Sequence, residues 1–176
     1  MAIQQEASSI DRLIAVLNSG GVGYEQGVDQ METIQRFDAF CRQMLASPSP
    51  DVDDESLALS RRLRECLLAL VSNGDADVEA LKSLNQISRH IAFRYSFDSE
   101  VGAFMEEQNG ESLLGLTIRD VAQLRTEGKW SRIKICANPD CKAAYYDATK
   151  ARTQRWHSYA TCGNKANVAA FRSRLS

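Results

Sequence analysis

The sequence has little that would place the protein in or across a membrane. No stretch approaches the roughly 18–20 consecutive apolar residues that a bilayer-spanning helix needs. Residues 1–6 lack the basic segment and the apolar segment of a secretory signal. We therefore expect a cytoplasmic protein with no membrane partner. Because that compartment is reducing, the 5 cysteines are expected to bind metal or to fill a core rather than to form disulfides.

Residues 1–128 also lack the groups that catalysis requires. Their one histidine, His90, lies near the end of a helical pattern, and we interpret it as an ordinary surface or core residue. Cys41 and Cys66 lie on apolar helical faces, where cysteine behaves as a small hydrophobic residue. The glycines in residues 20–23 are not followed by Gly-Lys-Ser/Thr, so they predict a turn and not a phosphate-binding loop. No nucleophile–base pair is evident, and we do not expect an enzyme.

Charge is distributed unevenly along the chain. Residues 1–128 carry 11 Lys/Arg and 21 Asp/Glu, a net charge of −10, whereas residues 129–176 carry 10 and 2, a net charge of +8. With 44% hydrophobic and 25% charged residues overall, the composition is that of an ordinary globular protein. The asymmetry predicts two domains with different partners, 1–128 and 129–176. The alternative is that the lysines and arginines of residues 129–176 only keep the surface of a small module hydrated.

Apolar residues recur with helical spacing over most of the first part. Breakers such as Ser47-Pro48-Ser49-Pro50 and Asn73-Gly74 separate the segments. The helices are expected at about residues 10–17, 29–45, 53–72, 78–91 and 111–127. The fold class is therefore mainly α.

Residues 91–106 follow a different pattern, because large apolar and polar residues alternate in 91–97. This period is typical of a half-buried strand, and residues 101–105 are its expected antiparallel partner. Four aromatic residues lie here, Phe93, Tyr95, Phe97 and Phe104. We expect them to be core residues; the alternative is that they line a pocket for a small-molecule effector.

The strongest motif in the sequence consists of two pairs separated by fifteen residues: Cys136 and Cys141, then His157 and Cys162. A structural zinc ion takes four tetrahedral thiolate or imidazole ligands. The turn residues 138–140 would bend the chain so that the two cysteines share one edge of that tetrahedron. All four ligands come from the protein, which predicts a structural ion with no open position for catalysis.

The surrounding sequence favours a small treble-clef-like module. The stretch between the two ligand pairs is expected to form a β-hairpin, with residues 143–146 as a strand and residues 147–150 as a turn. Residues 133–135 also alternate, and residues 163–172 are compatible with a helix. Such a short segment has too little core to fold alone, so the metal would supply roughly 10–16 kcal/mol of folding free energy.

There are three alternative interpretations of these cysteines. A Cys136–Cys141 disulfide disagrees with a reducing compartment. A deaminase-type catalytic zinc would need a His-x-Glu motif, which the sequence lacks. Unrelated placement of the cysteines is the third alternative, and iron could replace zinc in a thiolate-rich site.

These residues resemble the C-terminal signature of the CGNR zinc finger family. The matching positions are Cys136-Ala137-Asn138-Pro139-Asp140-Cys141, Asp147, Arg155-Trp156, Ser158 and Cys162-Gly163-Asn164. The resemblance, specific over about residues 132–174, implies an ABATE-type helical N-terminal domain and a role as a stress-induced transcriptional regulator of bacteria. Upstream, only the order of the helices supports it.

The chain departs from the family pattern at a few positions. His157 stands where family members typically have a third cysteine, and histidine is a competent zinc ligand. Lys165 stands where the naming tetrapeptide ends in arginine, and lysine replaces a bidentate arginine only in part. The tail that is usually strongly basic is interrupted by residues 167–170.

The leading functional hypothesis is a regulator that binds DNA through this basic module. Phosphate contacts are expected from Lys150, Arg152, Arg155, Lys165, Arg172 and Arg174, with Asn164 and Asn167 as base-edge readers. The alternative for Arg155 and Lys165 is packing or ion pairing with the acidic helical domain. Trp156 is expected in the core of the finger.

The second hypothesis is a zinc-stabilised protein-interaction or ligand-sensing module that binds no nucleic acid. The acidic domain could then dock its own basic finger. Under the first hypothesis the helical domain would be a sensor or a dimerisation surface, and a homodimer is a candidate assembly.

Overall fold

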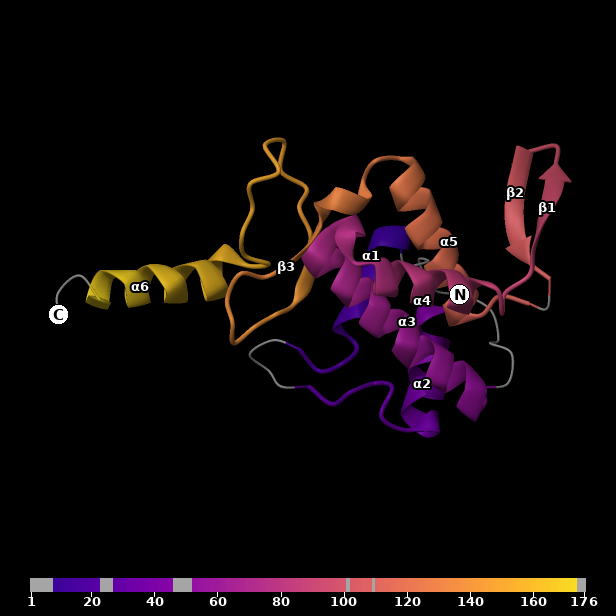
Figure 1. Cartoon of the computed structure of the whole chain (residues 1–176), viewed down its shortest axis with the longest axis horizontal. Helices are drawn as coiled ribbons and strands as arrows, with labels where there is room; N and C mark the ends of the chain where they lie inside the picture. The colour runs from indigo at the N-terminus through magenta and orange to yellow at the C-terminus, as the bar shows by residue number, and fades with distance from the viewer. Residues whose placement is uncertain (1–7, 23–26, 46–51, 101, 109, 174–176) are drawn as a thin grey trace, which may run out of the picture.

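The protein is mainly α-helical, with two small antiparallel sheets (Figure 1). The computed structural model describes residues 8–22, 27–45, 52–100, 102–108 and 110–173. The α-helices are α1 (Ser9–Asn18), α2 (Ile34–Met44), α3 (Asp54–Asn73), α4 (Val78–Ser88), α5 (Leu113–Thr126) and α6 (Asn164–Ser173). The strands are β1 (Phe93–Asp98), β2 (Gly102–Glu107), β3 (Ile133–Ile135) and β4 (Ala144–Tyr146). In the described part of the chain, no helix is both long and apolar enough to cross a membrane.

The helices begin where local capping chemistry allows. Asp53 and Ser56 form a reciprocal capping box at the start of α3, and Ser112 accepts a hydrogen bond from a backbone amide of α5. The expected start of α2 at Asp29 is wrong. The Asp29 carboxylate instead accepts the Met31 amide at 2.8 Å, which holds a turn, and α2 begins after Thr33.

One apolar core joins α1, α3, α4 and α5, with Leu13, Leu63, Leu67 and Ile87 almost fully buried in it. A neighbouring cluster packs the inner face of α2 against α1, α3 and α5. Cys41 and Cys66 are buried, as expected, and burial raises the pKa of their thiols to about 12 and about 11. His90 is an exposed surface residue.

A buried ion pair ties α1 to α5 within this core. The Arg12 guanidinium donates to both carboxylate oxygens of Asp120, with Nε at 2.7 Å and Nη2 at 2.8 Å. The two side chains are 9% and 2% exposed, so each charge depends on the other for its solvation. The pair therefore fixes the orientation of α1, which matters because the end of α1 contacts the C-terminal module.

The hairpin of β1 and β2 projects from the helical body (Figure 1). Its presence agrees with the sequence pattern, but the expectation that its aromatic residues are core is wrong. Tyr95 is 73% exposed, Phe97 82% and Phe104 39%, and only Phe93 packs against the core. The reason is that a two-stranded sheet has two faces, and no described helix covers the part of the hairpin beyond Phe93.

The β3–β4 hairpin of the C-terminal module docks on the helical body through apolar contacts. Ile133 and Ala144 are buried in the same core as α3 and α5. The side-chain amide of Asn18, at the end of α1, donates to the Ala144 carbonyl at 3.0 Å and accepts the Ala144 amide at 2.7 Å. The contact is thus apolar and amide-mediated, although the net charges of the two parts are opposite.

Replacement of Arg12 by alanine tests the importance of the buried pair. It leaves the Asp120 carboxylate buried without its cation, so we expect a loss of about 3–5 kcal/mol in the free energy of unfolding. Chemical denaturation followed by circular dichroism measures this. The control is Arg42→Ala, which removes an exposed pair with Asp38 and should cost less than about 1 kcal/mol. Equal effects of the two variants would contradict the interpretation.

Candidate metal centre

Cys136 and Cys141 flank a tight turn that directly follows β3. The Asn138 carbonyl accepts the Cys141 amide at 3.0 Å, and the Asn138 side-chain oxygen accepts the Asp140 amide at 3.0 Å. The Cys136 amide donates to the Ala143 carbonyl at 2.8 Å, which returns the chain toward β4. The Asn-Pro-Asp sequence therefore bends the backbone so that both sulfurs point to one side.

His157 and Cys162 come from the segment that leads into α6. Ser158 begins a short π-helical turn, Tyr159–Gly163, and its carbonyl accepts the Cys162 amide at 3.0 Å. α6 follows without a break, so the fourth ligand lies at the entry to the helix, as the spacing predicts. Gly163 permits this close packing, because a Cβ there would lie 2.7 Å from the Tyr159 ring and 3.1 Å from the Trp156 ring.

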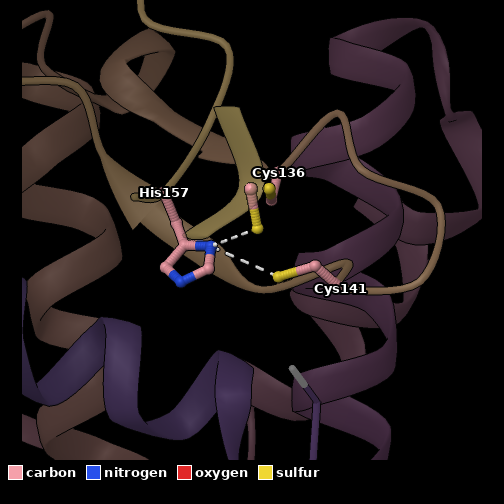
Figure 2. A group of neighbouring side chains, drawn as sticks. Cys136, Cys141 and His157 are labelled. Atoms are coloured by element: carbon pink, nitrogen blue, oxygen red, sulfur yellow. Dashed lines mark hydrogen bonds between the residues drawn. The ribbon is translucent and has the colours of Figure 1, made fainter. Parts of the chain in front are cut away.

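The four ligands meet at one point. One ligand atom from each of Cys136, Cys141, His157 and Cys162 lies within 4.8 Å of all the others. Figure 2 shows the His157 imidazole turned toward the sulfurs of the cysteines. Its Nδ1 lies 3.2 Å from Cys141 Sγ and 3.4 Å from Cys162 Sγ.

These distances fit tetrahedral zinc. With zinc–sulfur bonds of about 2.3 Å and zinc–nitrogen bonds of about 2.0–2.1 Å, the sulfur–nitrogen edge of a tetrahedron is about 3.5 Å. The five cysteines are free thiols, so the Cys136–Cys141 disulfide is ruled out here. Three thiolates and one imidazole satisfy the metal completely, which makes the centre structural.

The thiols of Cys136 and Cys141 have different pKa values. Burial opposes ionisation of Cys136, but hydrogen bonds, first that from His157, lower the pKa of its thiol to about 7. Burial, together with the neighbouring thiols of Cys162 and Cys136, raises the pKa of Cys141 to about 11. Several anionic sulfurs at this spacing require a cation among them, and a divalent metal supplies it.

Asp147 organises the loop that carries His157 back to the site. Its fully buried carboxylate accepts hydrogen bonds from Lys134 Nζ at 2.6 Å, the Gln154 amide at 3.1 Å and the Thr149 amide at 3.0 Å. The Lys134 ammonium, followed by the Thr149 hydroxyl, holds the pKa of Asp147 well below its usual range. This network explains why an aspartate stands at this position of the signature. Its partner Lys134 could not be identified from spacing.

The cations predicted to contact DNA lie on the surface of the same module. The exposed residues among the predicted set are Lys150, Arg152, Arg155, Lys165, Arg172, Asn164 and Asn167, whereas Arg174 lies outside the described residues. The alternative in which Arg155 packs on the helical domain finds no support, because its guanidinium lies 5.3 Å from the ring centroid of Trp156, within the finger. Trp156 is half-buried against the cysteines, as expected for a residue of the finger core.

The two asparagines make local contacts at the start of α6. Asn164 donates to the Ala160 carbonyl at 3.1 Å, and Asn167 donates to the Tyr159 hydroxyl at 3.0 Å. Both side chains are nevertheless exposed. A cavity of about 330 Å³ lies beside them, lined by Ala137, Asn138, Pro139, Asp140, Trp156, Lys165 and Ala166. No sequence pattern predicts this cavity, because its wall combines the cysteine turn with α6.

The fold and the ligand geometry define a small Cys₃His zinc finger attached to a helical body. Residues 132–175 match the CGNR zinc finger family, which confirms the resemblance for this part of the chain. The match does not extend to residues 1–128, so the ABATE-type domain stays a prediction. No curated protein matches the chain. The zinc in this site is structural.

Substitution of His157 tests the ligand set. His157→Ala removes one of four ligands and should weaken zinc binding by more than about 100-fold, since even outer-sphere changes cost 10–100-fold. His157→Cys supplies a fourth thiolate and should retain one zinc per chain. Competition with a chromophoric chelator measures both affinities.

The control for this experiment is His90→Ala, which removes an exposed histidine of the helical body and should leave zinc affinity unchanged. Undiminished zinc binding by His157→Ala would contradict the assignment of His157 as a ligand.

Proposed function

We propose that this protein is a transcriptional regulator that binds DNA through its zinc finger. The observation that carries the proposal is a set of exposed cations held on a zinc-stabilised scaffold. Duplex DNA presents a dense row of phosphates, and cations on a rigid surface bind it with release of counterions. The net charge of +8 in residues 129–176, from 10 Lys/Arg and 2 Asp/Glu, is suited to this.

The cations of the finger fall into two groups. Lys134 and Arg132 are used inside the module, where Lys134 binds Asp147 and Arg132 donates to backbone carbonyls. Within the described residues, no ion pair joins Lys150, Arg152 or Arg155 to a carboxylate. These side chains can therefore contact phosphate without breaking an ion pair within the described part of the protein.

The position of α6 favours contact with a DNA duplex. α6 extends from the finger at one end of the molecule's long axis, away from the helical body (Figure 1). A helix in this position can enter the major groove, where exposed side chains such as Asn164 and Asn167 reach base edges. An asparagine side chain can form two hydrogen bonds with the major-groove edge of adenine. Lys165 and Arg172 would contact phosphates near the two ends of the helix.

The acidic helical body restricts where DNA can bind. Residues 1–128 carry a net charge of −10, from 11 Lys/Arg and 21 Asp/Glu, which repels phosphate from the rest of the surface. The duplex would thus approach only the end that carries the finger. The helical body is then available as a sensor of stress signals.

Salt dependence tests the proposal directly. Affinity for a random duplex should fall steeply with salt, and Arg152→Ala should reduce the slope of log K against log salt by about 0.9 through loss of one phosphate contact. Arg62→Ala removes an exposed arginine of α3 and should leave the slope unchanged. Fluorescence anisotropy with a labelled duplex measures both.

The absence of any binding at low salt, with zinc present, would contradict the proposal. That result would favour the second candidate, a protein- or ligand-binding module. The observation on its side is the cavity of about 330 Å³ beside Trp156, which could accept an apolar side chain or a small ring.

A further inference from the structure

The outer edge of β1 offers unused backbone hydrogen-bonding groups. In the β1–β2 ladder the Gln108 amide bonds the Ala92 carbonyl at 2.9 Å. Hydrogen-bonded pairs alternate along an antiparallel ladder, so Tyr95 and Phe97 occupy positions whose amide and carbonyl groups point away from β2. Among the described residues, no hydrogen bond reaches these groups.

The opposite edge of the hairpin is already engaged. Arg119 of α5 donates to the outward carbonyl of Met105 on β2 at 3.0 Å. In Figure 1, β2 lies on the side of α5 and β1 is the outer strand. An open strand edge with large apolar side chains is a template for pairing with another chain, and soluble proteins usually cover or charge such an edge. β1 is therefore the edge available for a partner.

The sequence of β1 is self-complementary when read antiparallel to itself. The segment is Arg94-Tyr95-Ser96-Phe97-Asp98, with Ser96 at its centre. A second copy rotated about Ser96 places Arg94 opposite Asp98 and Tyr95 opposite Phe97. Opposite charges and aromatic pairs across strands both stabilise an antiparallel ladder.

We propose that two copies of the protein associate through β1 to form a four-stranded antiparallel sheet with a two-fold axis at Ser96. The outward groups of Tyr95 then pair with those of Phe97 in the second copy, and the symmetry repeats the pair, which gives four backbone hydrogen bonds. Arg94 lies between Glu106, its partner on β2, and Asp98 of the second copy. Such an isologous contact closes on itself and gives a dimer.

Charge selects this register over its neighbour. A shift that pairs Tyr95 with Tyr95 would also satisfy the outward backbone groups. It would place Arg94 opposite Ser96, however, and leave Asp98 without a cation across the strand. An odd shift would put aromatic side chains on opposite faces of the joined sheet.

The dimer does not rest on the proposed DNA binding. The hairpin and α6 lie at different ends of the molecule (Figure 1), so strand pairing leaves both fingers accessible. If a duplex binds, the dimer presents two fingers far apart, and each would contact its own site. Failure of one proposal therefore leaves the other intact.

Association is tested on the full zinc-loaded chain without DNA. Sedimentation equilibrium should show a concentration-dependent monomer–dimer equilibrium. Phe97→Lys should raise the dissociation constant by at least about tenfold, because it removes both Tyr95–Phe97 pairs of the dimer. The matched control is Val78→Lys, which changes a 59% exposed apolar residue on α4 and should have no effect.

Cysteine cross-linking tests the register. Ser96 lies opposite its own copy in a non-hydrogen-bonded pair, where the Cα atoms are about 4.5 Å apart and a disulfide can form. Ser96→Cys should give a covalent dimer with oxidised glutathione, whereas Tyr95→Cys and the wild type should not. A cross-link in Tyr95→Cys alone would overturn the proposed register. A wild type that stays monomeric at about 1 mM, or a dimer that Phe97→Lys leaves unchanged, would overturn the proposal.

Discussion

The coordination of one zinc ion by Cys136, Cys141, His157 and Cys162 is the constraint on which the C-terminal module depends. The strands of this module, β3 and β4, have three residues each and are too short to enclose a core. Buried thiols so close together would otherwise compete for protons, as the divergent pKa values of Cys136 and Cys141 indicate. The metal binds all four side chains. It thereby fixes the Cys136–Cys141 turn, the loop that contains Asp147 and the start of α6 relative to one another.

Two further interactions transmit this order to the rest of the chain. Asp147 holds the loop between the ligand pairs through Lys134, so that a buried carboxylate replaces hydrophobic packing. Asn18 clamps β4 to α1, and Ala144 and Ile133 extend the helical core into the module. The charge boundary near residue 128 is therefore not a boundary in packing. The finger packs directly against the acidic body, while Lys150, Arg152 and Arg155 are exposed on its surface.

The sequence predicts those features that depend on local pattern. Ligand spacing identified the metal set because few arrangements of cysteine and histidine chelate a tetrahedral ion. Helical periodicity located α1, α3, α4 and α5. It failed at Asp29, where a side chain competes with the helix for the Met31 amide. The alternation of apolar and polar residues predicted β1. It could not predict that Tyr95 and Phe97 are exposed, since exposure depends on elements distant in the sequence. The pairing of Asn18 with Ala144, 126 residues away, has no signature in one sequence.

X-ray absorption at the zinc edge, on full-length protein never exposed to chelators, tests the central claim most directly. The account predicts one zinc per chain with three sulfurs at about 2.3 Å and one nitrogen at about 2.0–2.1 Å. A shell of four sulfurs, a shell dominated by oxygen, or protein without stoichiometric metal would contradict it.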